Sequence, residues 1–495
     1  MRLLRSCASV AELPSSGGQR VDDPSPVAKL MRGLLTAWLV VAVSYIALIP
    51  VSNNFVLYPL ILSLAGIATL GIIGVRPSVN PLLLVPASIW FVFVSYGTTV
   101  ALISDGESWP RILVFFLFWP VVYSLIVIGF KRHVVKIMFY SGAIVTVVIS
   151  LTFLAGALIA LGITPFESLP FWTTSPLGLR YVVGGSGAIA LTAHSLPLLL
   201  WWGAMRVASL VCGRNDLFLP PMWLRFFAGA LAIAAAVIAW RRGILLVLLL
   251  VPIIMLVIWL LPRVKDRPEG RGPRLLVPLV RVIACFLSAG LISMGIQRQV
   301  TSMLGEGVRS VATVLGLESS AGLSQADLDG GKPDLISDDD WIGDRIRASE
   351  TRFLTDADST IDVVFGHGIG ASFDREGIDR SIRSWQTELQ YQGLYYWTGL
   401  TGILLLLAIF IFPVRALRRA FRSVGFLRGS LFVSCIGAAA VLIGNATNPY
   451  MQTPGHMWPV FFPFMIAGVI LSTKRTSDLI AADCPEPVRS VTASL

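Results

Sequence analysis

Long apolar runs alternate with short polar segments along most of the chain. A helix needs about 20 mostly apolar residues to cross the hydrocarbon of a bilayer. Runs close to that length occupy residues 34–50, 55–75, 81–102, 111–130, 134–162, 187–211, 222–240, 243–261, 275–296, 394–414, 429–445 and 457–472. The pattern therefore predicts an all-α polytopic membrane protein of about twelve transmembrane helices.

Basic residues gather in alternate connecting segments, which fixes an orientation by the positive-inside rule. The segments 131–136, 263–274 and 415–428 are rich in Lys and Arg, whereas 51–54 has neither and 103–110 contains acidic residues and no Lys or Arg. We expect the basic segments, and both ends of the chain, to lie in the cytoplasm. The exception is the pair Arg241 and Arg242, which falls at an outward-facing turn in this arrangement.

One polar segment, residues 297–393, is much longer than the others and falls between the ninth and tenth apolar runs. It contains 17 Asp and Glu against 9 Lys and Arg. The predicted organisation is a cytoplasmic tail (1–33), nine helices (34–296), a large periplasmic loop (297–393), three helices (394–472) and a second cytoplasmic tail (473–495). From residue 341 onward, the mixture of aromatic, Arg and Gly residues predicts folded structure, such as short helices on the membrane surface.

Composition supports the prediction of a membrane protein and argues against other classes of protein. The chain is 55% hydrophobic and 14% charged, with a mean hydropathy of +0.75, whereas soluble domains carry roughly 25% charged residues. The net charge of +10 comes mainly from topology-setting loops, so we do not infer nucleic-acid binding. The five cysteines form no CxxC pair, and no metal cluster is readable.

The first candidate site is the turn that contains Arg241 and Arg242, between two apolar runs. Arginines at a membrane boundary must face water, an acid or an anion. A guanidinium makes bidentate bonds to phosphate groups, so this pair could bind a phosphate or pyrophosphate. Snorkelling to lipid headgroups explains the same position equally well.

The second and third candidates lie in the long loop. Arg352 is followed by Gly366-His367-Gly368-Ile369-Gly370, in which the glycines permit tight turns and close approach of the backbone to a ligand. His367 is one of four histidines and could act as a general base. Glu388, beside an aromatic run, is an alternative carboxylate base facing a stacked sugar, or a solvated acid above an aromatic belt.

Two stretches resemble the O-antigen polymerase and O-antigen ligase (Wzy-type) superfamily of bacterial membrane glycosyltransferases. The stretch AWRRGILLVLLL, with Arg242-Gly243, is similar to the family's Arg-Gly turn before an apolar helix. The second stretch is similar to the end of the family's large periplasmic loop, where an arginine precedes a G-x-G-x-G turn and a Gly-Leu-x-Gly helix start follows. The matching residues are Arg352, Gly366, Gly368, Gly370, Gly399 and Gly402.

The resemblance implies a GT-C-like helical fold in a bacterial inner membrane, acting on undecaprenyl-pyrophosphate-linked oligosaccharides among membrane lipids. It implies no cofactor and no metal, and a chain-length-regulating co-polymerase is a candidate partner. Family ligases carry a histidine where this chain has Glu388, which favours a polymerase of O-antigen, capsule or exopolysaccharide repeats over a ligase. Arg242, supported by Arg241 and Arg352, would bind pyrophosphate, and Glu388 or His367 would be the base.

Two other functional classes remain as alternatives. A lipid-linked glycan flippase or another transporter would suit twelve helices, although transporters commonly show two related halves, which this sequence lacks. A sensor or scaffold that binds partners through the acidic loop would tolerate changes of the arginines. The sugar, the linkage and the oligomeric state are not readable from the sequence.

Overall fold

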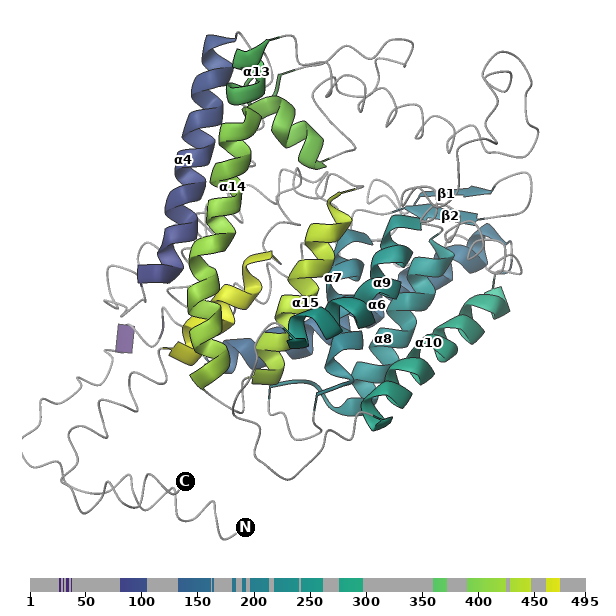
Figure 1. Ribbon diagram of the computed structural model, residues 1–495. Helices are drawn as coiled ribbons and strands as arrows, with labels where there is room; N and C mark the ends of the chain where they lie inside the picture. The colour runs from purple at the N-terminus through teal and green to yellow at the C-terminus, as the bar shows by residue number, and fades with distance from the viewer. Residues whose placement is uncertain are drawn as a thin grey trace, which may run out of the picture.

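A computed structural model of the chain describes residues 81–104, 132–161, 163, 180–183, 189–192, 196–212, 218–239, 242–260, 276–296, 359–371, 390–423, 428–446 and 460–471, with isolated positions between 26 and 37. The described part is almost entirely helical (Figure 1). The helices are α4 (Pro81–Ile103), α6 (Arg132–Ala160), α7 (Leu196–Ser209), α8 (Met222–Ile238), α9 (Arg242–Leu260), α10 (Leu276–Ile296), α13 (Thr360–Phe365), α14 (Gln390–Ser423), α15 (Arg428–Gly444) and Val460–Leu471.

Four described helices are long and apolar enough to cross a membrane by length and composition. They are the segments Val85–Ile103, Val135–Ile159, Val277–Met294 and Gln390–Phe421. Shorter apolar helices occupy Met222–Ile238, Gly243–Val257, Gly429–Gly444 and Val460–Leu471. These features are those of a membrane protein. The predicted apolar runs at 55–75 and 111–130 lie outside the described residues, and so does the run at 34–50 apart from Leu34 and Ala37.

The prediction of one helix over 187–211 is wrong in its first part. Residues of this segment form strand β2 (Ile189–Thr192), which pairs antiparallel with β1 (Arg180–Val183), and α7 begins at Leu196. The sequence between the strands, Gly184-Gly185-Ser186-Gly187, favours a hairpin turn rather than a helix. Pro197 follows in the first turn of α7, where its fixed φ and missing N–H are tolerated.

The helices form two groups that are visible in Figure 1. Helices α4, α13 and α14 pack together on one side, and α6 to α10 pack with α15 on the other. The helix Val460–Leu471 contacts both groups through adjacent residues. The ring of Phe461 lies 6.0 Å from Trp90 of α4, whereas the ring of Phe462 lies 5.5 Å from Trp201 of α7.

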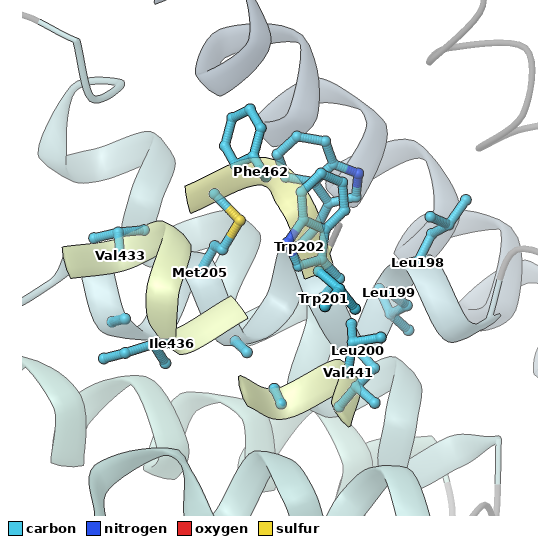
Figure 2. Close-up of a cluster of buried hydrophobic side chains, with 14 of the residues drawn as sticks. Leu198, Leu199, Leu200, Trp201, Trp202, Met205, Val433, Ile436, Val441 and Phe462 are labelled. Atoms are coloured by element: carbon cyan, nitrogen blue, oxygen red, sulfur yellow. The ribbon is translucent and has the colours of Figure 1, made fainter. Parts of the chain in front are cut away.

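The centre of the larger group is an aromatic and aliphatic core between α7 and α15 (Figure 2). Trp201 and Trp202 are fully buried, with ring centroids 4.0 Å apart. Glycines of neighbouring helices make room for them: a Cβ at Gly437 of α15 would lie 2.7 Å from the Trp201 ring. Small residues at such contacts let helices approach closely, as is common in membrane proteins.

Two fully buried arginines connect neighbouring helices of the larger group: Arg225 connects α8 to α7, and Arg206 connects α7 to α6. The Nη1 of Arg225 donates to the carbonyl of Ser209 at the end of α7, over 3.2 Å. The Nη1 of Arg206 donates to the Phe139 carbonyl of α6, also over 3.2 Å, and its guanidinium lies 5.7 Å from the Trp202 ring. The positive charge of Arg225, beside Ser209, complements the partial negative charge of the α7 C-terminus.

Candidate functional site

The glycine turn of residues 366–370 is bound by its backbone to the ends of α4 and α14. The N–H groups of His367 and Gly368 donate to the carbonyls of Tyr396 and Trp397, over 3.0 and 2.8 Å. The N–H of Ile369 donates to the Gly97 carbonyl of α4 over 3.1 Å. The turn therefore joins two helices that are far apart in the sequence.

A break in α14 makes its carbonyls available to the turn. Gly399 has φ 58° and ψ −165°, so the first segment of α14 ends there before a second segment continues. Carbonyls just before a helix end have no partner within the helix and need other donors. The turn supplies two of them, and the hydroxyl of Tyr96 on α4 lies 3.1 Å from a third carbonyl, that of Thr398.

The close approach of the turn to this break requires glycine on both sides. Gly366 has φ 76°, and a Cβ there would lie 2.5 Å from the backbone nitrogens of Gly399 and Thr398. A Cβ at Gly399 would lie 2.5 Å from the carbonyl oxygen of Val364. The glycines thus allow close contact with the protein's own backbone, and the turn holds His367 in a fixed place.

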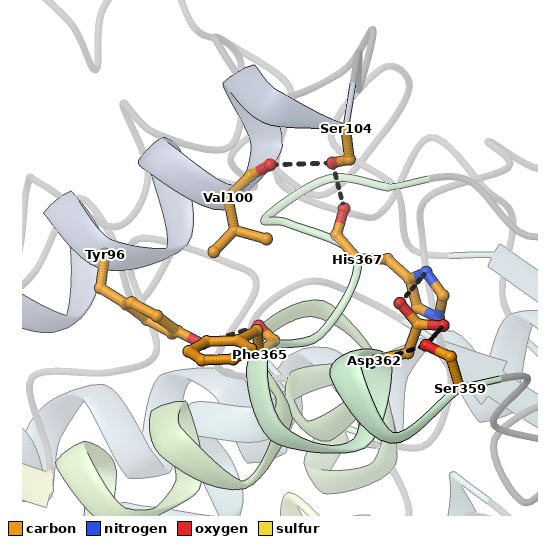
Figure 3. A network of polar contacts seen from close by, with 7 residues as sticks. All are labelled: Tyr96, Val100, Ser104, Ser359, Asp362, Phe365 and His367. Atoms are coloured by element: carbon orange, nitrogen blue, oxygen red, sulfur yellow. Dashed lines mark hydrogen bonds and ion pairs between the residues drawn. The ribbon is translucent and has the colours of Figure 1, made fainter.

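The side chain of His367 lies beside the carboxylate of Asp362 (Figure 3). It also packs against the ring of Tyr396. Its Nδ1 is 3.9 Å from Oδ1 of Asp362, and its ring centroid is 4.3 Å from that of Tyr396. The Oγ of Ser104 lies 2.6 Å from the carbonyl of His367. The His367 side chain is 33% exposed, so a substrate can reach it.

The carboxylate of Asp362 is itself held in place by the start of α13. Ser359 caps this helix by accepting from the N–H of Asp362 over 3.2 Å. The Oγ–H of Ser359 donates to Oδ2 of Asp362 over 2.7 Å, which leaves Oδ1 toward His367 (Figure 3). Nδ1 is therefore the ring nitrogen of His367 that faces this carboxylate, and Nε2 is the other ring nitrogen.

The structure brings together one set of the predicted residues. Gly366, His367, Gly368 and Gly370 lie in one turn, and all three glycines have positive φ. Arg242 is the first residue of α9, and its side chain is outside the described part. Arg241, Arg352 and Glu388 also lie outside the described residues.

Several site residues were missed by sequence reasoning. Asp362 carried a readable signal, because Ser359-x-x-Asp362 matches the capping pattern that opens a helix. Tyr96 and Ser104 carried none, because their part depends on contacts between distant segments. Tyr396 belongs to the predicted aromatic run, but its contact with His367 was not predicted. Within the described residues, His, Cys, Asp and Glu do not gather in groups of three or more; the expectation of no metal stays a prediction.

Comparison with known proteins adds no family to these observations. No protein family, no curated protein and no solved structure matches the chain.

Proposed function

We propose that this protein is a membrane glycosyltransferase that polymerises lipid-linked oligosaccharide repeat units at the outer face of a bacterial inner membrane. The proposed topology has about twelve transmembrane helices, cytoplasmic termini and a large periplasmic loop over 297–393. The observation that carries the proposal is the carboxylate–imidazole pair Asp362–His367, held on a rigid turn and open to a substrate. Such a pair suits the removal of a proton from a sugar hydroxyl.

The proposed reaction joins two lipid-linked substrates. The donor is a glycan on undecaprenyl pyrophosphate, and the acceptor is the next lipid-linked repeat. The acceptor oxygen forms a bond to the anomeric carbon of the donor, while the bond from that carbon to the pyrophosphate breaks. The proton of the acceptor hydroxyl passes to Nε2 of His367, and the bonding electron pair leaves with the pyrophosphate.

The arginines have a separate role in this proposal. Arg242 opens α9, and with Arg241 and Arg352 it would bind the pyrophosphate and stabilise its developing charge. The arginines would stabilise the departing pyrophosphate, and the base would take the proton of the attacking hydroxyl. Glycosyl transfer needs both functions. Glu388 is the alternative base, and the same experiment compares it with His367.

The test is glycan profiling of a deletion strain that is complemented with wild type, His367→Gln, Glu388→Gln or Arg242→Ala, at matched protein abundance. We expect His367→Gln to lose polymer, and single lipid-linked repeats to accumulate on the outer face, because general-base catalysis contributes typically 10²–10⁴-fold. Normal polymer from His367→Gln would refute His367 as the base. Accumulation of repeats on the inner face would instead show that transport is the step lost.

A further inference from the structure

Helix α13 exposes two large apolar side chains, although it lies in a polar segment of the chain. Ile361 is 69% exposed and Phe365 is 47% exposed. The two residues are four positions apart, so they share one face of the helix. In water, this face would lose the stabilisation that burial of apolar area provides. The position of α13 indicates what covers the face instead.

The exposed face of α13 adjoins an apolar stripe on α14, which is a candidate membrane-spanning helix. Helix α13 packs against α14 near its break (Figure 1), where a Cβ at Gly399 would lie 2.5 Å from the carbonyl oxygen of Val364. Beyond the break, exposed apolar side chains recur every three or four residues on one face of the helix: Leu400, Leu404, Leu407, Ile411 and Val414. This stripe faces lipid when α14 crosses a membrane.

The charges at the far end of the stripe give the depth of α13 in the membrane. Residues 400–414 contain no charged side chain, whereas Arg415 and Arg418 follow and must reach the membrane surface. Leu400 lies about 22 Å along the helix from Arg415, and the hydrocarbon is about 30 Å thick. Leu400 and the adjacent α13 are therefore within about 8 Å of the opposite boundary, on its hydrocarbon side.

Helix α4 gives a similar depth independently. The hydroxyl of Tyr96 lies 2.7 Å from the carbonyl of Phe365, so these two residues are close to the same level. The apolar part of α4 continues from Tyr96 to Ile103, which is 79% exposed, and Asp105 follows in the sequence. Ile103 is about 10 Å beyond Tyr96 along the helix. Helices that lie in a membrane interface bury their apolar face to a depth of about 5–10 Å, which agrees with both estimates.

The polar side chains of the same segment lie on its other side. In Figure 3 the ring of Phe365 lies toward Tyr96, whereas the side chains of Asp362 and His367 lie away from that ring. The carbonyl of His367 is 2.6 Å from the Oγ of Ser104, which is past Tyr96 toward the end of α4. One side of the segment therefore suits hydrocarbon, and the other suits water and lipid headgroups.

We propose that α13 inserts into the outer leaflet of the membrane, with Ile361 and Phe365 against the acyl chains of its phospholipids. The leaflet is the outer one in the topology proposed above. Insertion fixes the level of Asp362 and His367 at the boundary between hydrocarbon and water, where a lipid-linked substrate presents its head group. The inference itself does not rest on the proposed function, because it follows from the exposure and the depth of α13.

Photo-crosslinking identifies what contacts this face. The amino acid p-benzoylphenylalanine, which forms a bond to a nearby C–H carbon when irradiated, replaces Ile361 or Phe365 in the full-length protein, in nanodiscs of one synthetic phospholipid. Intact-mass spectrometry should show a gain of one phospholipid mass at both positions. The same replacement of Ile411, which is 64% exposed on the stripe, is the positive control. Replacement of Thr360, exposed on another side of α13, should give far less adduct.

The products separate the possible occupants of the face. Absence of a phospholipid adduct at both positions, while Ile411 gives one, would overturn the inference. A gain that equals the mass of a co-purified polyprenyl lipid would assign the face to the substrate instead. A crosslinked dimer, in discs that hold two copies, would assign it to a second copy of the chain. Either of these products in place of the phospholipid adduct also overturns the inference.

Ile361→Ser tests whether insertion holds α13 in place. Ile361 makes little contact within the protein, since it is 69% exposed, and serine has a helix propensity close to that of isoleucine. Hydrogen–deuterium exchange of the peptide 359–371 in nanodiscs should rise by about threefold or more, because burial of apolar area in the membrane is lost. Ile411→Ser loses lipid contact three helical turns from the break and should leave this peptide unchanged. Equal exchange in wild type and Ile361→Ser would refute anchoring by Ile361.

The outcomes for the inference and for the proposed function are distinct. Phospholipid adducts at 361 and 365 together with normal polymer from His367→Gln would support insertion of α13 and refute His367 as the base. Loss of polymer from His367→Gln without these adducts would support the base and refute insertion.

Discussion

Replacing Gly366 with alanine should release the His367 turn from the helices beneath it. Gly366 has φ 76° and ψ −176°, a region that only glycine occupies readily. Its missing Cβ leaves room for Gly399 and Thr398, whose backbone nitrogens would otherwise lie 2.5 Å away. Alanine must therefore move the turn outward. The hydrogen bonds to the carbonyls of Tyr396 and Trp397 would lengthen or break.

The size of the effect follows from these parts. A non-glycine residue in this region costs about 1–3 kcal/mol, and each of the two hydrogen bonds contributes about 0.5–1.5 kcal/mol. The sum is about 4 kcal/mol for the docking of the turn. Because 1.4 kcal/mol is a factor of ten in an equilibrium constant, amide exchange in the turn should accelerate by roughly 1,000-fold.

Hydrogen–deuterium exchange with mass spectrometry measures this opening in the peptide that covers residues 359–371. The matched control is Gly290→Ala in α10, where a Cβ would meet nothing within 4 Å and alanine favours the helix. Gly290→Ala should leave exchange in this peptide unchanged. Equal exchange rates in wild type and Gly366→Ala would refute the claim that the turn depends on glycine at this position.

Two further predictions concern contacts that hold the helices together. Tyr96→Phe removes the hydroxyl that lies 2.7 Å from the carbonyl of Phe365 and 3.1 Å from that of Thr398. Hydrogen–deuterium exchange in the peptide 359–371 should rise by a factor that corresponds to about 1 kcal/mol. An unchanged exchange rate would contradict this prediction. Arg225→Ala removes the charged donor to Ser209, so the free energy of unfolding should fall by about 2 kcal/mol. Thermal unfolding in detergent measures this change. The control is Arg225→Lys, which keeps the charge and should lose less stability.

Helix positions followed from the sequence where an apolar run was long and bounded by polar residues. The predicted run 275–296 coincides with α10 to within one residue, and 243–261 and 222–240 agree with α9 and α8 to within two. The start of α14 was not predictable in the same way. It begins at Gln390, inside the segment assigned to the loop, because burial of a polar first turn depends on tertiary contacts that hydropathy does not contain.

The glycine turn of the candidate site was predictable from the sequence, whereas the residues around the turn were not. The spacing of Gly366, Gly368 and Gly370 indicated a tight turn, and the positive φ angles agree with it. The close approach was predicted toward a ligand, whereas the turn packs against the protein's own backbone. What the turn approaches could not be read, since Ile369 bonds to Gly97 and only the folded chain brings these residues together. The hairpin of β1 and β2 was missed because its strands sit within a largely apolar stretch.

The residue proposed as the base and the arginine proposed to bind pyrophosphate belong to different groups of helices. His367 is held by α4 and α14, whereas Arg242 begins α9, which packs against α7 and α15. Among the described residues, Tyr391 bonds α14 to α15, and the helix Val460–Leu471 contacts both groups through Phe461 and Phe462. These contacts hold the two groups of helices together. Loss of polymer from a change at Phe461 would therefore report on the placement of the two groups, whereas loss from His367→Gln would report on proton transfer.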